Sequence, residues 1–221
     1  MPAVDAIETR PLLRPGKPVR LMATLSPRDD VRWGALAERI AVAVGPRLSS
    51  GVLVGRVVGH GERLRLALQG ARQASAALSD AGPMLATDVR DFYPSVRPSA
   101  LGNGLSEAGA DPSDARAAAE MAASWEERGH RGLPIGPPAS AVIACALLAS
   151  VDRAVGDRPF LRWVDDYLIG VTSEEEGDAV RTRLDEALGR LGLERSEPKS
   201  RFLPRGAAGP WPGSLSAGED L

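Results

Sequence analysis

The 221-residue chain is poor in cysteine, histidine, lysine and aromatic residues, with one cysteine, two histidines, two lysines and 4% aromatic residues. The single Cys145 excludes an internal disulfide, and its Ala-rich helical surroundings favour a small core residue over a nucleophile. His60 and His130 lack the spacing of metal ligands, which disfavours a histidine-based metal site. The longest apolar stretch, residues 139–151, is too short to span a bilayer, and the amino terminus lacks a signal-peptide pattern. We therefore expect a cytoplasmic protein that does not enter a membrane.

Charge is nearly balanced overall but unevenly distributed along the chain. The net charge is -2, and the 43% hydrophobic and 25% charged residues are typical of a globular protein. Residues 1–72 carry twelve Arg or Lys against six Asp or Glu, whereas residues 73–221 carry fifteen against twenty-three. The split favours an amino-terminal lobe that meets phosphates and a carboxy-terminal lobe that holds cations. A solvated Arg-rich surface without a ligand is the alternative.

Two adjacent carboxylates, Asp165 and Asp166, interrupt an apolar run that extends from Phe160 to Val171. Burying such a pair is unfavourable unless a cation neutralises it. Because neighbouring side chains of a regular strand point to opposite faces, both acids reach one ion only where the chain turns, as at a hairpin tip. A polar turn is the simpler alternative, but the apolar flanks on both sides favour a metal site.

A third carboxylate, Asp88, ends the strand-like apolar segment of residues 84–87. A strand end beside the hairpin tip would bring Asp88 close to Asp165. Clustered carboxylates resist ionising together until a divalent cation neutralises them. Ligands that are all oxygen favour magnesium or manganese.

The secondary-structure pattern predicts a mixed fold. Helices are expected over residues 32–44, 70–80, 113–128, 139–155 and 174–191, and strands over 84–89, the hairpin of 160–171 and 201–203. Ser113 is expected to cap the third helix, and Ser173 with Glu176 to form a capping box for the last. Residues 51–66 are expected to form a loop with short strands. From residue 84 the order, without insertions, is β, α, β, β, α, β, which is the split βαβ order of ferredoxin-like sheets.

Three regions are expected along the chain. Residues 1–80 would form a small, mainly helical lobe, and residues 81–205 a compact α/β (α+β) unit with inserted helices. Residues 206–221 are rich in Gly, Pro, Ser and Ala, which indicates a disordered tail.

Three ordered segments resemble successive palm motifs of reverse transcriptases: Asp88–Val96, Gly132–Ser140 and Trp163–Asp166. The bacterial retron, group II intron and phage-defence types are the most similar, and the resemblance extends over roughly residues 10–205. It implies a polymerase palm with a reduced fingers lobe and the activity of an RNA-directed DNA polymerase. It also implies an RNA template, a DNA or RNA primer and deoxynucleoside triphosphates as partners.

The resemblance further implies that Asp88, Asp165 and Asp166 hold two magnesium ions, with manganese as the alternative, for nucleotide transfer to a primer 3′-hydroxyl. Asp88 and Asp165 would bind the metals directly, and Asp166 would act more through its charge. Lys199 resembles a late palm lysine that supplies a proton or positive charge to the leaving pyrophosphate. A solvated basic residue is the alternative for Lys199.

Other positions match the family's nucleotide-binding residues. Tyr93 falls where related enzymes place a bulky aromatic that excludes a 2′-hydroxyl, which implies a DNA product, whereas Phe92 is expected to be a core residue. Gly136 and the neighbouring backbone at Ile135 are expected to lie against nucleotide and template. Many family members have Gln where this chain has Ile135.

Cations of the amino-terminal segment resemble the fingers residues that clamp a triphosphate. They are Arg14, Lys17 and Arg20, of which Arg20 is the firmer match. For Asp29 and Asp30, which precede the first helical segment, we expect a structural capping role.

The end of the chain and Tyr93 bear on the choice between three interpretations of function. Only sixteen low-complexity residues follow Arg205, so no helical thumb is expected. The alternatives are then a poorly processive enzyme, one that depends on a partner protein or structured RNA, or a truncated and inactive relative. A catalytically weak or inactive palm-fold protein that binds nucleic acid or acts as a scaffold is the alternative from another class. An RNA polymerase of the same superfamily is disfavoured by Tyr93.

Overall fold

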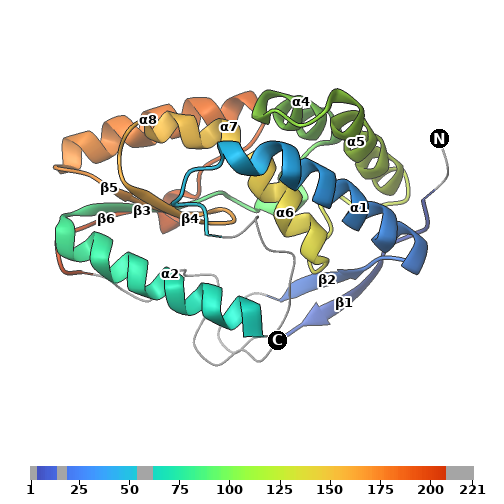
Figure 1. Cartoon of the computed structure of the whole chain (residues 1–221), viewed down its shortest axis with the longest axis horizontal. Helices are drawn as coiled ribbons and strands as arrows, with labels where there is room; N and C mark the ends of the chain where they lie inside the picture. The colour runs from blue at the N-terminus through green and yellow to red at the C-terminus, as the bar shows by residue number, and fades with distance from the viewer. Residues whose placement is uncertain (1–3, 14–18, 54–61, 208–221) are drawn as a thin grey trace.

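The structure, a computed structural model, describes residues 4–13, 19–53 and 62–207, with the backbone alone at residues 62–66 and 68. It contains two antiparallel sheets and several helices, so the predicted α+β class is confirmed (Figure 1). The strands are β1 (Glu8–Leu12), β2 (Arg20–Thr24), β3 (Met84–Asp88), β4 (Phe160–Trp163), β5 (Asp166–Gly170) and β6 (Arg201–Leu203). The helices are α1 (Pro27–Val44), α2 (Glu62–Ala81), α3 (Phe92–Ser95), α4 (Pro98–Ala108), α5 (Pro112–Glu126), α6 (Pro138–Leu147), α7 (Ala149–Asp152) and α8 (Glu174–Arg190). Short 3₁₀ turns are η1 (Gly45–Arg47), η2 (Arg153–Val155) and η3 (Glu197–Lys199).

The larger sheet has the strand order β4-β5-β3-β6, and the smaller sheet pairs β1 with β2. In the larger sheet β3 is central and runs antiparallel to both β5 and β6. Helices α4, α5 and α6 lie between β3 and β4 in the chain, and α8 lies between β5 and β6. The chain order of strands and helices is therefore the one that the sequence predicted from residue 84 onward.

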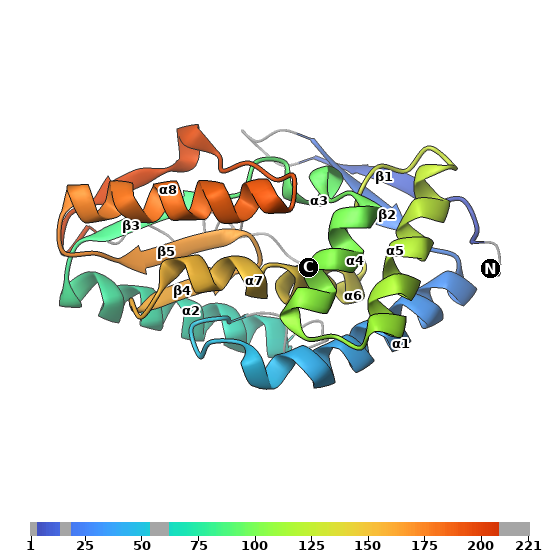
Figure 2. The ribbon, with the colours of Figure 1, turned by 90° about the horizontal axis from the view of Figure 1, so that it is seen from above.

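Helices cover the larger sheet from two sides. Helix α2 packs against β4 and β5, while α7 and α8 lie on the opposite side of the strands (Figure 1). Helix α8 turns Val180, Leu184 and Leu188 into the core, which is the apolar face that its sequence predicts. Figure 2 shows the larger sheet at one end of the molecule and β1, β2, α1 and α5 at the other.

The amino-terminal residues share their core with the rest of the chain. Helix α1 packs across α6, and Trp33 Nε1 donates a hydrogen bond to Ser140 Oγ at 3.0 Å. The Trp33 ring also meets the Trp125 ring edge to face, with centroids 5.1 Å apart. One hydrophobic cluster thus includes residues from both sides of residue 80.

Two helix starts show how local hydrogen bonds fix the ends of elements. The predicted capping box at α8 is confirmed in part: Ser173 Oγ accepts from Glu176 N at 3.2 Å. The Glu176 carboxylate, however, accepts from the backbone and side chain of Thr172, one residue before the usual position. The prediction that Ser113 caps α5 is wrong, because Asp111 is the cap and accepts from Ser113 N at 2.8 Å.

The predicted apolar helix over residues 139–155 is divided into α6, α7 and η2. The stretch Pro138–Val155 is nevertheless long and apolar enough, by length and composition only, to cross a membrane. Length alone therefore does not exclude a membrane span, contrary to the sequence argument. The stretch is 72% buried inside the protein, a property that core helices share.

Other boundaries also differ from the sequence prediction. Helix α2 begins at Glu62, so residues 62–66 are helical and not part of the loop that was predicted for residues 51–66. Residues 54–61 lie outside the described part of the chain, as do residues 208–221 of the predicted tail. The capping role expected for Asp29 and Asp30 is wrong, because both residues lie inside α1 and Ser26 is the cap, with its Oγ accepting from Asp29 N at 3.3 Å. The buried Asp29 side chain instead accepts from Asp5 N through Oδ2 at 2.6 Å.

Candidate active site at the turn between β4 and β5

The three predicted carboxylates lie together at one end of the larger sheet. Asp88, the last residue of β3, stands directly opposite Asp166, the first residue of β5. Asp165 occupies the adjoining turn, since β4 ends at Trp163 and pairs it with Asp166. Asp88 and Asp166 are buried, with 5% and 8% of their surfaces exposed, and Asp165 is half-buried. The register of β3 and β5 therefore brings Asp88 close to Asp165 and Asp166.

The turn that carries Asp165 has an uncommon backbone conformation. Val164 has a φ of +54°, in the left-handed region that β-branched residues rarely adopt. A positive φ at the first residue of a two-residue hairpin turn matches the right-handed twist of the strands, and glycine is the usual residue there. Valine in this place indicates that surrounding contacts hold the turn.

Burial and mutual repulsion shape the electrostatics of the cluster. The pKa of Asp88 is raised to about 8, first by burial and then by the charge of Asp165, while a hydrogen bond from Lys199 works in the opposite direction. The pKa of Asp165 is raised to about 7, first by burial and then by the charge of Asp166. Near neutral pH the cluster therefore favours taking up protons or a cation.

Lys199 contacts the first acid directly. Its Nζ donates to Asp88 Oδ2 at 2.9 Å, and the lysine side chain keeps 63% of its surface exposed. Burial lowers the pKa of Lys199, but the hydrogen bond and charge of Asp88, together with the charges of Asp166 and Asp165, raise it overall. The backbone secures this segment, since Ser196 N donates to the Asp88 carbonyl oxygen at 2.7 Å. Lys199 thus lies beside the predicted catalytic acids, and its role toward a leaving pyrophosphate stays a prediction.

The carboxylates suit a hard divalent cation by donor chemistry. Asp88 Oδ1 is buried and has no hydrogen-bond partner among the described residues, so an oxygen ligand is available there. The acids do not form a complete metal-coordination site, however. The described residues contain no group of three or more His, Cys, Asp or Glu arranged to hold a metal. Metal binding would require carboxylate side chains to rotate toward a shared ion.

Two further predicted residues lie near the acids. Tyr93 is half-buried, and burial followed by the charge of Asp165 raises the pKa of its hydroxyl. Arg20, the first residue of β2, lies close enough for its charge to favour ionisation of both Asp165 and Tyr93. Phe92 is buried in the core, as predicted, and meets the Tyr93 ring edge to face. Arg14 and Lys17 fall outside the described residues.

The second motif packs against β2. Ile135 is half-buried, and its carbonyl oxygen accepts from Ala23 N at 2.6 Å. Gly136 has a φ of +127°, and a Cβ there would lie 3.1 Å from the Ala23 carbonyl oxygen. The backbone conformation and the contact with Ala23 therefore explain why residue 136 is a glycine. Its contact with nucleotide stays a prediction.

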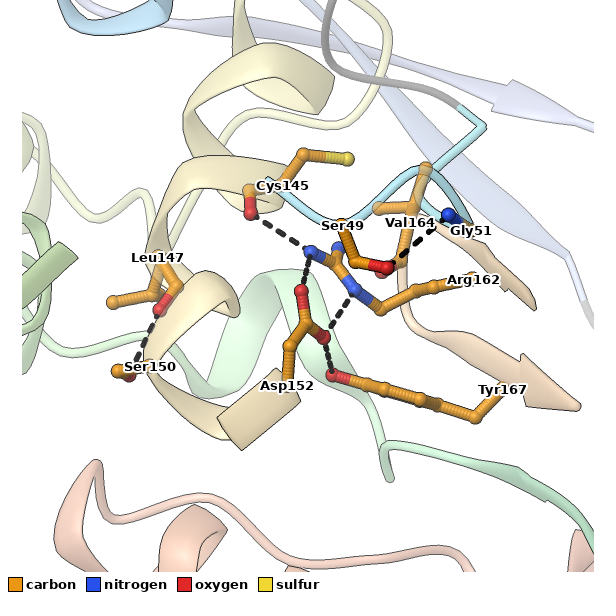
Figure 3. Close-up of polar contacts among 9 residues, drawn as sticks. All are labelled: Ser49, Gly51, Cys145, Leu147, Ser150, Asp152, Arg162, Val164 and Tyr167. Carbon is orange, nitrogen blue, oxygen red and sulfur yellow. Dashed lines mark hydrogen bonds and ion pairs between the residues drawn. The ribbon is translucent and has the colours of Figure 1, made fainter. Parts of the chain in front are cut away.

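Sequence reasoning missed two features of this site. Gly132 lets the second motif close against Tyr93, because a Cβ at Gly132 would lie 2.1 Å from the Tyr93 carbonyl oxygen. The second is a buried ion pair between Arg162 and Asp152, in which Arg162 also contacts the turn at Val164 (Figure 3). The sequence shows Asp152 and Arg162 as single charged residues, each beside or within an apolar segment. Their spacing along the chain does not indicate that the two side chains form an ion pair.

Comparison with known proteins supports the fold. No family model and no curated protein matches this chain. A solved structure of telomerase from Candida albicans, in complex with the TWJ fragment of telomeric RNA, matches it with a TM-score of 0.61 and 12% identity. The match covers 91% of this chain but 42% of the telomerase chain. At this identity the likeness shows the fold alone, which is similar to that of a reverse-transcriptase-related enzyme and does not distinguish a retron or group II type.

Proposed function

We propose that the protein is an RNA-templated DNA polymerase that adds deoxynucleotides to a primer 3′-hydroxyl. In this proposal the four-stranded sheet is a polymerase palm and residues 1–80 supply a reduced fingers lobe. The observation that carries the proposal is the pairing of Asp88 with Asp166 across β3 and β5, with Asp165 on the next turn. Its occurrence within a telomerase-like fold supports a polymerase over an unrelated acid cluster.

We assign metal binding to Asp88 and Asp165, with Asp166 adding negative charge beside them. When bound, two magnesium or manganese ions would neutralise negative charge on the triphosphate and on the primer 3′-oxygen as it loses its proton. The buried and unpartnered Oδ1 of Asp88 supports this assignment, since an orphaned carboxylate oxygen is otherwise unfavourable. The raised pKa values of Asp88 and Asp165 support it as well, because they reflect charges that lack sufficient compensation.

Lys199 is assigned to the leaving group. Its Nζ carries a proton, and its mostly exposed side chain can turn from Asp88 toward a pyrophosphate beside the acids. A positioned ammonium can donate a proton or stabilise negative charge on the departing oxygen. Arg20, whose charge favours ionisation of Asp165, is assigned to binding the triphosphate, since a guanidinium can bind two phosphate oxygens at once.

Tyr93 is assigned to sugar selection. The ring is half-buried near Asp165 and backed by the buried Phe92 ring, so it cannot readily move aside. An aromatic ring held against the 2′ position of an incoming nucleotide would exclude a ribonucleotide by steric contact.

A catalytically weak or inactive palm-fold scaffold that binds nucleic acid is the second candidate. Two observations favour it: Lys199 already pairs with Asp88, and the described residues offer no finished metal cage. Against it stands the clustering of three acids, which a scaffold would not need.

Primer extension by the purified chain separates the candidates. The assay compares RNA with DNA templates and deoxynucleotides with ribonucleotides, in magnesium or manganese, with and without added cellular RNA. The polymerase proposal expects DNA synthesis on an RNA template. Retention of template-primer duplex without extension under every condition would instead support the scaffold.

A further inference from the structure

A buried ionic network of Asp152, Arg162 and Tyr167 contacts the β4–β5 turn at Val164 (Figure 3). Arg162, on β4, is fully buried, and its Nε and Nη2 donate to the two carboxylate oxygens of Asp152 at 2.7 and 2.6 Å. Tyr167, on β5, donates from its hydroxyl to the same carboxylate at 2.9 Å. Asp152 ends α7, so the network ties the β4–β5 hairpin to the helices beside it.

The remaining donors of the guanidinium reach the turn and α6. Nη1 of Arg162 donates to the Val164 carbonyl oxygen at 2.9 Å, and Nη2 donates to the Cys145 carbonyl oxygen at 3.1 Å. Val164 is the residue with the left-handed backbone, and Asp165 follows it directly. One guanidinium therefore links the strained turn to a carboxylate on α7 and a carbonyl on α6.

Stability alone does not account for this arrangement. A buried ion pair is often no more stabilising than apolar side chains of similar volume, because both charges lose their hydration. A strained backbone persists where its surroundings over-determine it. The contact from Arg162 to Val164 acts at the residue with the left-handed backbone, directly before Asp165.

We propose that Asp152, Arg162 and Tyr167 are positioning residues that hold the Val164–Asp165 turn in its left-handed conformation and thereby fix Asp165 relative to Asp88. The inference rests on the proposed function for its catalytic meaning. It assigns no contact with substrate to these three residues, which act through the turn. The planar guanidinium is essential because a lysine ammonium cannot reach both oxygens of Asp152 and the two carbonyls together.

The test removes the network without leaving a buried charge. A triple variant, Asp152→Leu with Arg162→Met and Tyr167→Phe, replaces all three polar groups with apolar ones of similar size, which buried ion pairs commonly tolerate. Arg162→Lys keeps the charge and is the second variant, for the case that the triple variant does not fold. Tyr167→Phe alone removes one hydroxyl and is the mildest change. Leu101→Ala, which removes a fully buried side chain of α4 outside the network, is the control for general destabilisation.

Three measurements are made on each folded variant: amide hydrogen exchange at residues 164–166, Mn²⁺ affinity by electron paramagnetic resonance, and kcat and KM for primer extension. We expect exchange at the turn to accelerate and Mn²⁺ affinity to fall by about tenfold or more in the triple variant and in Arg162→Lys. The loss of activity should appear in kcat, with the nucleotide KM little changed, because the network does not touch the nucleotide. Leu101→Ala should lower the melting temperature without these changes.

The outcomes separate this inference from the proposed function. A folded triple variant or Arg162→Lys with wild-type exchange at the turn and wild-type Mn²⁺ affinity overturns the positioning role. A wild-type protein that neither binds Mn²⁺ nor extends a primer overturns the proposed function instead. In that case the exchange comparison still decides whether the network holds the turn.

Discussion

The ammonium nitrogen of Lys199 lies 2.9 Å from Oδ2 of Asp88, across the end of the central strand β3. This contact offsets one charge of the acid cluster, and Asp165 and Asp166 add negative charge beside Asp88. The cluster therefore combines one exposed cation with several carboxylates that remain under-compensated, an arrangement typical of a site that meets a positively charged ligand.

Replacement of Lys199 tests its assignment to the leaving group. Lys199→Ala should lower kcat for nucleotide addition by about a hundredfold, which is a usual contribution of a general acid. Lys199→Arg retains the positive charge and should keep more activity than the alanine variant. Single-turnover extension measures the effect, and an Ala variant within about twofold of wild type would remove Lys199 from the mechanism.

Tyr93→Ala should raise the incorporation of ribonucleotides relative to deoxynucleotides by about tenfold or more, because the ring no longer excludes the 2′-hydroxyl. The matched control is Tyr93→Phe, which keeps the ring and should keep the selectivity. Competitive incorporation on one template gives the ratio directly. Equal ratios for Ala, Phe and wild type would mean that another group selects the sugar.

Gly132→Ala should destabilise the fold by about 2 kcal/mol or more, measured as the free energy of unfolding in urea. Two causes add here, since Gly132 has a φ of +75° and its Cβ would lie 2.1 Å from the Tyr93 carbonyl oxygen. Gly129→Ala separates them, because Gly129 has a φ of +88° with open space around it and should lose only about 1 kcal/mol. Equal losses at the two positions would show that the contact with Tyr93 contributes nothing.

Glu176 predicts a specific dependence of stability on pH. Its pKa is lowered from 4.5 to about 2, first by the hydrogen bond from the Thr172 hydroxyl, then by the Thr172 backbone N–H and by Arg158. Because the folded-state pKa lies below the unfolded one, the stabilisation is complete above about pH 4.5 and is lost as the pH falls toward 2.

Glu176→Gln should therefore lower the urea midpoint at pH 7, and the difference from wild type should shrink as the pH falls below about 4.5. Glu175→Gln, an exposed neighbour in the same helical turn, is the control and should change the midpoint little at any pH. A difference for Glu176→Gln that stays constant with pH would contradict the assignment.

Several parts of the molecule could be predicted because their signals are local. The helix after Ser173 has its cap and its apolar face within one segment, and α8 follows both. The meeting of Asp88 with the Asp165–Asp166 pair was predictable because an acid at a strand end and an acid pair in an apolar hairpin point to the same edge of a sheet.

Other parts could not be predicted because they depend on distant partners. Helix α4 contains Gly102 and Gly104, which disfavour a helix locally. Packing explains them, since a Cβ at Gly104 would lie 2.3 Å from the Leu147 side chain, and one at Gly102 would lie 3.1 Å from Ala119. Local propensity gives no sign of such close helix contacts.

The ion pair of Arg162 with Asp152 was hidden for a related reason. The sequence predicted one helix over residues 139–155, whereas the helix is interrupted between α6 and α7. Asp152 lies in the short helix after this break, where it receives two hydrogen bonds from Arg162. The apolar periodicity of this segment does not indicate where the helix is interrupted.

Primer extension by acid-to-amide variants tests the central claim most directly. On an RNA template with magnesium, Asp88→Asn and Asp165→Asn should each lower the rate of deoxynucleotide addition by at least about a thousandfold. Asp157→Asn, which changes an exposed acid outside the cluster, should extend the primer at the wild-type rate. Extension by Asp88→Asn or Asp165→Asn at the wild-type rate would contradict the account.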